Sequence, residues 1–144
     1  MDNSDKHQDK DAVAVAENML RATEDAYLAR DFEAYASYFH LPQKIGNFDG
    51  DHLIETHEDL RAIFDAMCDA LEIEGVVAMH RTVIEAAFQD PDTVNVTFDS
   101  RYVMRGLLFG DKLVAHGTLQ RIDGRWQITD GRYASEKHLI DKAI

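Results

Sequence analysis

The sequence contains few of the residues that cross-link, interrupt or anchor a chain. Its 144 residues include one cysteine, Cys68, which excludes an intrachain disulfide and a cysteine-based zinc site. Two prolines and no Gly- or Ser-rich stretch leave no obvious linker between domains. No apolar run approaches the roughly 18 residues that cross a bilayer. We therefore expect a single domain over residues 12–144, preceded by a disordered tail over residues 1–11, which is polar after Met1.

Basic residues are also scarce. Lysine and arginine total 15 against 27 aspartates and glutamates, which gives a net charge of −12. Binding to a phosphate backbone or to an anionic lipid surface requires a basic patch, so nucleic acid and membrane partners are not expected. The N-terminal segment is acidic and lacks the hydrophobic stretch of a secretory signal, which favours a cytoplasmic location.

Apolar residues recur at helical spacing in the first half of the chain. The pattern predicts a helix over residues 12–30 and a shorter one after Asp31, a favoured N-cap residue. A third helix is predicted between Thr56, which starts a capping box, and Gly75. Its apolar face comprises Leu60, Ile63, Phe64, Met67, Cys68 and Leu71. Short extended segments are expected over residues 44–48 and 53–55.

The second half of the chain is rich in β-branched and aromatic residues. Four segments, residues 76–88, 94–104, 113–122 and 126–133, are separated by short turn signals that favour antiparallel neighbours. Helices followed by a meander predict the α+β class.

Turn geometry predicts which side chains face the core. A two-residue loop at Asp123-Gly124 places Gly117 opposite Asp130 and Ala115 opposite Arg132 on an apolar inner face. A turn at Gly110-Asp111 brings Met104 opposite Gly117. The inner face of the second strand is then Val94, Val96, Phe98, Ser100, Tyr102 and Met104, and the outer sheet face includes Val103, Val114, Ile122 and Tyr133.

The first strand of the meander has two candidate phases. One directs Ala78, His80, Thr82, Ile84, Ala86 and Phe88 inward, and the other directs Met79, Arg81, Val83, Glu85 and Ala87 inward. We favour the first because it buries no charged side chain.

The segments ARDFEAYASYF and RIDGRWQITDGRYAS carry a resemblance. With the covering helix and meander between them, the chain resembles the NTF2-like superfamily from about Ala12 to Ser135. It is most similar to the SnoaL-like branch of polyketide cyclases and scytalone-dehydratase-type enzymes. The resemblance implies a cone in which three N-terminal helices pack on a strongly curved antiparallel sheet. It also implies a pocket at the wide end and a homodimer formed through the outer sheet face.

Two residues match positions that carry chemistry in such enzymes. The resemblance implies a histidine early on the first long strand and an acid on the last strand, which here are His80 and Asp130. Small residues opposite Asp130 predict a hollow beside it. A histidine and a carboxylate there could transfer a proton without a cofactor, as a lyase, isomerase or cyclase. The expected ligand is a small, largely apolar organic molecule. The residues expected to contact it are Arg132, Tyr102, Ser100, Met104, Tyr27, Tyr35, Phe39, Phe64 and Trp126.

A second interpretation stays open at this point. Asp130 and Arg132 could pair with each other as a buried salt bridge at the end of the sheet, and the aromatic residues could be plain core. The protein would then be a non-catalytic ligand-binding or dimerisation module. No metal is expected under either interpretation, because the spacings of His40, His52 and His57 match no metal-binding motif.

Overall fold

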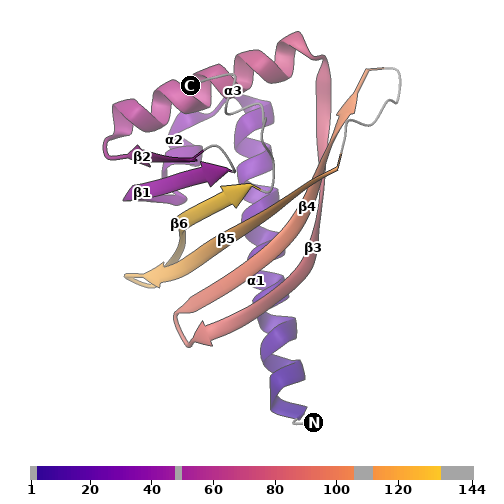
Figure 1. Ribbon diagram of the computed structural model, residues 1–144, viewed down its shortest axis with the longest axis vertical. Coiled ribbons are helices and arrows are strands. Elements are labelled where there is room, and N and C mark those ends of the chain that lie inside the picture. The colour runs from indigo at the N-terminus through magenta and orange to yellow at the C-terminus, as the bar shows by residue number, and fades with distance from the viewer. Residues whose placement is uncertain (1–2, 48–49, 106–111, 134–144) are drawn as a thin grey trace.

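The computed structural model describes residues 3–47, 50–105 and 112–133 of the chain. In chain order the elements are α1 (Asn3–Ala29), α2 (Phe32–Ala36), β1 (Phe39–Asn47), β2 (Gly50–Ile54), α3 (His57–Ile73), β3 (Val76–Asp90), β4 (Thr93–Met104), β5 (Leu113–Ile122) and β6 (Arg125–Tyr133) (Figure 1). Helix α1 includes most of the segment over residues 1–11 for which a tail was expected.

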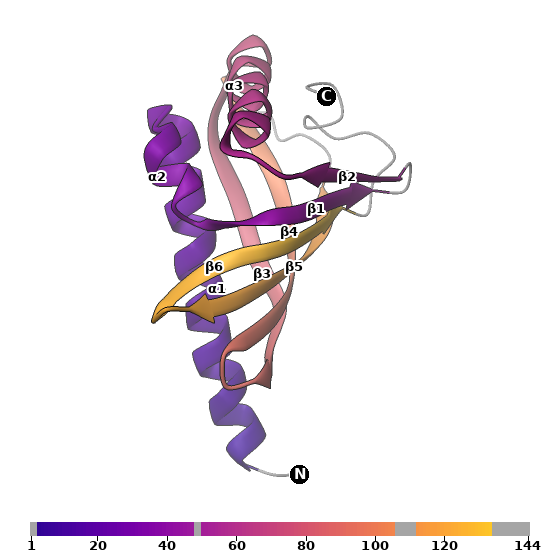
Figure 2. The ribbon, with the colours of Figure 1, turned by 90° about the vertical axis from the view of Figure 1, so that its left-hand side faces the viewer.

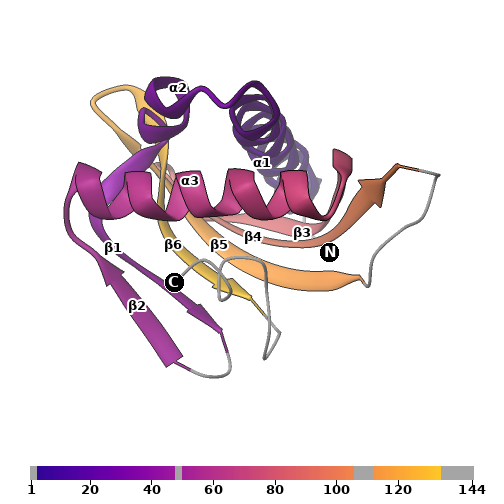
Figure 3. The same ribbon diagram turned by 90° about the horizontal axis from the view of Figure 1, so that it is seen from above.

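The strands form one curved sheet in the order β2-β1-β6-β5-β4-β3. Neighbours run antiparallel except β1 and β6, which are parallel, so the sheet is mixed and includes the four-stranded meander that the sequence predicts. Helices α1 and α2 lie against the same side of the sheet, and α3 crosses one end (Figures 2 and 3). The predicted α+β architecture, three helices covering a curved sheet, is confirmed.

Local sequence signals determine where two of the helices begin. The Thr56 hydroxyl accepts a hydrogen bond from the Asp59 backbone N–H at 3.1 Å, and the Asp59 carboxylate accepts one from the Thr56 N–H at 3.2 Å. This is the predicted capping box of α3. The Asp31 carboxylate caps α2 by accepting from the Ala34 N–H at 3.1 Å. All six apolar residues predicted for the inner face of α3 are buried.

The hairpin between β5 and β6 follows the predicted register only near its turn. Ile122 pairs with Arg125 and Leu119 pairs with Ile128, as expected. A β-bulge then adds one residue to β6, so that Thr118, rather than Gly117, pairs with Asp130. The predicted placements of Asp130 opposite Gly117 and of Arg132 opposite Ala115 are therefore wrong. Because side chains alternate along a strand, one extra residue moves both to the other face.

Beyond this bulge, the inner positions of β6 are taken by two other residues. Gly131 pairs with Gly117, and Tyr133 pairs with the buried Ala115 and packs on the core. Tyr133 was expected on the outer sheet face, and this placement is also corrected by the extra residue.

A second bulge divides β3 into halves of opposite phase. Met79 is buried and Arg81 half-buried in the first half, whereas His80 is exposed. The register shifts between Val83 and Glu85, after which Ala86 is buried instead. Each of the two candidate phases is thus correct for one half of the strand. The inward placement of His80 is wrong, because His80 precedes the bulge.

The pairing of β4 with β5 differs from the prediction without changing the faces. Val96, rather than Met104, pairs with Gly117, and the difference of an even number of residues leaves every side chain on its predicted side. Val94, Val96, Ser100 and Tyr102 are buried, and Phe98 and Met104 are half-buried. The predicted inner face of β4 is therefore confirmed, whereas the turn at Gly110-Asp111 lies outside the described residues.

Candidate functional site

A cavity of about 90 Å³ lies between α1 and the inner face of the sheet. Successive turns of α1 provide one wall, formed by Ala16, Met19, Leu20, Thr23 and Tyr27. The inner faces of β4, β5 and β6 provide the opposite wall, mostly with apolar side chains, and β1 and α2 contribute further aromatic and polar groups. An apolar enclosure with a few polar groups is the usual composition of a small-molecule site.

Two glycines that are paired on adjacent strands border the cavity. Gly117 and Gly131 are direct partners on β5 and β6, and both line the cavity. A Cβ atom built on Gly131 would meet no atom within 4 Å, and one built on Gly117 would lie 3.5 Å from Val96 Cγ1. The sequence predicts a hollow beside Asp130, opposite Gly117, whereas in the structure the strand partner of Gly117 at the cavity is Gly131.

A pair of tyrosines borders the cavity. The Tyr27 hydroxyl donates a hydrogen bond to the Tyr35 hydroxyl at 2.8 Å, and both side chains are buried. Burial raises the pKa of both phenols well above the ordinary value, since a phenolate would lose its hydration there. Phe64 stacks on Tyr27 with ring centroids 5.5 Å apart and holds it from behind. The cavity therefore presents neutral phenols at physiological pH.

Gln43 contributes an unused acceptor. Its amide nitrogen donates to the backbone carbonyls of His40 and Ile128, each at 3.0 Å. The other amide atom, Oε1, is fully buried and has no hydrogen-bond partner. Because flipping the amide would direct Oε1 at two carbonyl oxygens, the orientation is determined by these contacts.

Arg81 brings a positive charge to the same cavity. Its guanidinium donates to the Leu20 carbonyl and, at 3.1 Å, to the Thr23 hydroxyl, so α1 holds the group in place. No ion pair among the described residues involves Arg81. The sequence indicated Arg81 only in the phase that we did not favour, and it carried no signal for Gln43.

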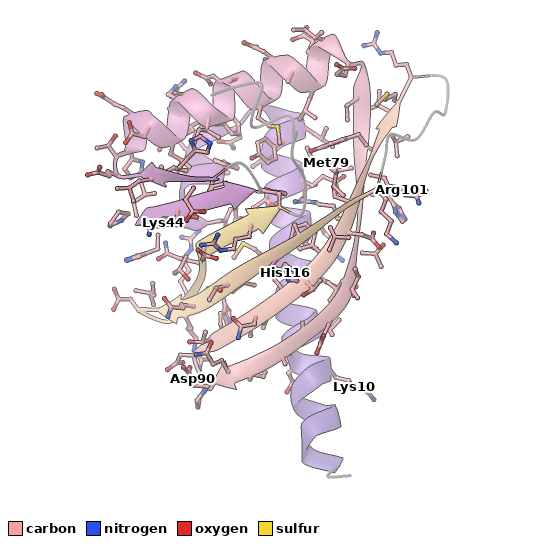
Figure 4. The ribbon with its side chains drawn as sticks, in the orientation of Figure 1. Lys10, Lys44, Met79, Asp90, Arg101 and His116 are labelled. Carbon is pink, nitrogen blue, oxygen red and sulfur yellow. The ribbon has the colours of Figure 1, made fainter. Side chains whose placement is uncertain are left out.

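The structure does not bring His80 and Asp130 together. His80 is exposed on β3 and pairs with Arg101, which Figure 4 labels at the right-hand margin of the molecule. Asp130 contributes to the cavity lining, but its side chain is 38% exposed and its Oδ2 lies 3.9 Å from Arg132 Nε. A proton relay between His80 and Asp130 therefore has no geometric basis here.

Arg132 belongs to an ion-pair network on the outer face. Its Nη1 lies 3.0 Å from Asp51 Oδ1, and this hydrogen bond raises the pKa of the guanidinium. Its partner on β5, His116, hydrogen-bonds the Thr97 hydroxyl through Nδ1 at 2.8 Å (Figure 4). Asp130 and Arg132 lie within ion-pair distance of each other, but on the outer face and partly exposed, not as the buried pair on the inner face that one interpretation of the sequence anticipated.

The other predicted contact residues divide into two groups. Tyr27, Tyr35 and Phe39 line the cavity. Phe64 lies behind them, and Tyr102, Ser100 and Met104 face inward on β4 without appearing in the lining. Trp126 lies elsewhere, with its ring centroid 6.3 Å from that of Phe88.

The raised phenol pKa values predict a loss of stability in alkali. The fold favours the protonated forms of Tyr27, Tyr35 and Tyr102, so this contribution is complete below the unfolded pKa of about 10 and is lost as pH rises above it. We expect phenolate absorbance from these residues to appear together with unfolding, monitored by circular dichroism. Reversible titration of all the tyrosines near pH 10 with the fold intact would contradict this.

No group of three or more His, Cys, Asp or Glu side chains is arranged to hold a metal ion in the part of the chain that the structure describes. None of the helices within that part is long and apolar enough to span a membrane.

Comparison with known proteins identifies the fold. No family model and no curated protein matches the sequence. Among solved structures, a domain of unknown function with a cystatin-like fold from Nostoc punctiforme PCC 73102 is 14% identical with a TM-score of 0.66, covering 99% of this chain and 83% of that one. An NTF2-like protein of unknown function from Shewanella oneidensis MR-1 is 15% identical with a TM-score of 0.64, over 83% of this chain and 96% of that one.

A third solved structure supports the same fold. An NTF2-like protein with a cystatin-like fold from Novosphingobium aromaticivorans is 13% identical with a TM-score of 0.64, covering 98% of this chain and 89% of that one. Identities this low establish a shared architecture and no shared activity. Together with the curved sheet and its helical cover, they show that this chain has the NTF2-like, cystatin-like fold.

Proposed function

We propose that this protein is a ligand-binding module that holds a small organic molecule in the cavity between α1 and the sheet. The observation that carries the proposal is a mostly apolar cavity of about 90 Å³ whose lining includes polar side chains such as Gln43 and Arg81. An apolar enclosure with a few polar groups is the usual composition of a small-molecule site. Tyr27, Tyr35 and Phe39 would contact that ligand.

The structure favours binding over the catalytic interpretation of the sequence. Proton transfer requires an acid or a base within hydrogen-bond reach of the substrate. His80 is on the opposite sheet face, and the Asp130 carboxylate is engaged near Arg132. We also propose that the protein belongs to the SnoaL-like branch, because of the segments ARDFEAYASYF and RIDGRWQITDGRYAS. The proton-transfer chemistry of that branch is not part of this proposal.

A binding screen tests the proposal. Small neutral and charged molecules of up to about ten heavy atoms would be screened by ligand-observed NMR against the protein and against its Gly131→Val variant, in which the cavity is filled. We expect several molecules to bind the unmodified protein and not the variant. Equal binding to both proteins, or no binding at all to the unmodified protein, would refute a ligand site in this cavity.

We propose further that the protein forms a homodimer through the outer sheet face. Val103, Val114 and Ile122 lie half-buried among polar residues on β4 and β5, a mixed composition that suits an interface. Light scattering should give about twice the mass of one 16.3 kDa chain. Val114→Glu should shift the equilibrium to monomer because it buries a charge, whereas Leu53→Glu at an exposed site on β2 should not. A monomer at high concentration would contradict the dimer.

The proposed location is the cytoplasm. Cys68, the single cysteine of the chain, is free and buried, and burial raises the pKa of its thiol. An unpaired thiol is compatible with a reducing compartment. Fractionation of the source cells with an antibody to the protein would test this location.

A further inference from the structure

We infer that the ligand is a small hydroxycarboxylate whose carboxylate pairs with Arg81 and whose hydroxyl donates to Gln43. This inference rests on the proposed ligand-binding function and specifies its chemistry. It follows from two polar groups that line the same cavity and come from β3 and β1, and from the volume of the cavity.

The first group is the Arg81 guanidinium, which carries five N–H donors in a planar fork. Contacts with Leu20 and Thr23 use Nη2 alone. Glu17 and Glu24 border Arg81 at a surface hollow, but neither forms an ion pair with it, and Glu24 Oε2 accepts a hydrogen bond from the Met79 backbone N–H at 2.8 Å. A bidentate carboxylate is the group that the planar fork of a guanidinium fits best.

The positive charge of Arg81 acts on two nearby tyrosines, Tyr35 and Tyr102. Its positive charge opposes the rise in the pKa of Tyr35 and Tyr102 that burial causes. An anion bound here would therefore contact the Arg81 guanidinium and lie close to neutral phenols. Because the whole chain carries a net charge of −12, a local cation is required to attract an anion at all.

The second group is Gln43 Oε1, which requires a donor. Carbonyls of His40 and Ile128 already bind the amide nitrogen, and Gln43 lines the cavity, so the inferred ligand is the source of the donor that this oxygen lacks. Leaving a buried acceptor unpaired costs about 1–3 kcal/mol. A carboxylate alone has no donor to offer, whereas a hydroxyl on the same molecule would satisfy this atom.

The volume limits the size of the ligand. A water molecule needs roughly 10–15 Å³ of such space, so about 90 Å³ accommodates a few heavy atoms and no polycyclic skeleton. Apolar side chains of Ala115, Leu119 and Ile128 would pack against the carbon chain. A hydroxy acid of about three to six carbons meets all three requirements.

Ligand-side comparisons test the inference without altering the protein. The probes are lactate and 3-hydroxybutyrate, their neutral amides lactamide and 3-hydroxybutyramide, and butyrate, which lacks the hydroxyl. Calorimetry or NMR titration should show that each amide binds at least tenfold more weakly than its acid, and butyrate at least fivefold more weakly than 3-hydroxybutyrate. Equal affinities within either comparison would overturn the inference.

Matched variants locate the charge. Arg81→Gln should weaken binding of 3-hydroxybutyrate at least tenfold, and Arg81→Lys should retain part of the affinity. Arg101→Gln removes the same charge from the exposed strand neighbour of His80 and should change nothing. Thermal unfolding checks that each variant folds, and the probe comparisons stand even where Arg81→Gln does not. Undiminished binding of 3-hydroxybutyrate by a folded Arg81→Gln variant would overturn the assignment.

The two proposals fail in different ways. If neutral molecules bind and Gly131→Val abolishes their binding, the cavity is a ligand site and only the hydroxycarboxylate is refuted. If no probe and no screened molecule binds, whether charged or neutral, both proposals are refuted and the cavity holds water alone.

Discussion

Phe64→Ala should destabilise the protein by about 3–5 kcal/mol, a large part of the stability of a domain this size. Phe64 is 2% exposed, and its ring centroid lies 4.7 Å from that of Tyr35 and 5.6 Å from that of Phe32. Removing the ring leaves a cavity that two helices cannot close, because each is held by its other contacts. Urea unfolding followed by circular dichroism measures the change.

The exposed end of the same helix offers a control. Ile73 is 83% exposed, so Ile73→Ala should change the free energy of unfolding by no more than about 0.5 kcal/mol. The Phe64 ring stacks on the ring of Tyr27, which lines the cavity. Ligand affinity should therefore also fall in the Phe64→Ala variant at temperatures where the variant is still folded. A loss of stability below about 1 kcal/mol would mean that this aromatic cluster is not the core of the domain.

Gly131→Val should lower the ligand affinity at least 100-fold without unfolding the protein. A Cβ atom at this position meets open space, the backbone does not require glycine, and the added methyl groups project toward Gly117 and the cavity. Valine also suits a strand better than glycine, so the free energy of unfolding should stay constant or rise by about 0.5–1 kcal/mol. Titration with the best molecule from the screen, together with urea unfolding, measures both quantities.

A graded series makes this prediction more specific. At Gly117 a Cβ atom would make an ordinary contact with Val96 Cγ1, so Gly117→Ala adds less volume and should weaken binding less than Gly131→Val. Thr118→Val changes the neighbouring residue, which faces Asn95 on the other side of the sheet, and should leave affinity unchanged. Retained binding in Gly131→Val would place the ligand site outside this cavity.

Local signals in the sequence were sufficient for the starts of α2 and α3 and for the faces of β4, but not for the start of α1, which lies at Asn3 rather than at residue 12. The capping box at Thr56 and the periodic apolar residues that follow it depend only on neighbours within one or two turns, and α3 forms where they predict. Alternation along β4 likewise survived a wrong register with β5, because the error was an even number of residues.

The candidate site depended on features that no local pattern encodes. The two bulges each add one residue to a strand, and a single addition exchanges inner and outer side chains for the rest of that strand. His80 precedes the bulge in β3, and Asp130 follows the bulge in β6. Both side chains therefore lie on the outer face of the sheet rather than on the expected inner face. Nothing in the alternation of residues near Ile84 or Thr129 distinguishes a bulge from a regular strand.

The amino-acid sequence by itself determined the fold class, the starts of α2 and α3 and the inner face of β4. Only the tertiary structure decided which groups meet at the cavity. Arg81 and Gln43 lie on β3 and β1, far apart in the chain, and become neighbours of one cavity through the curvature and pairing of the sheet. The physical reason is that strand phase and sheet order are set by packing between distant segments, whereas capping and periodicity are set within a few residues.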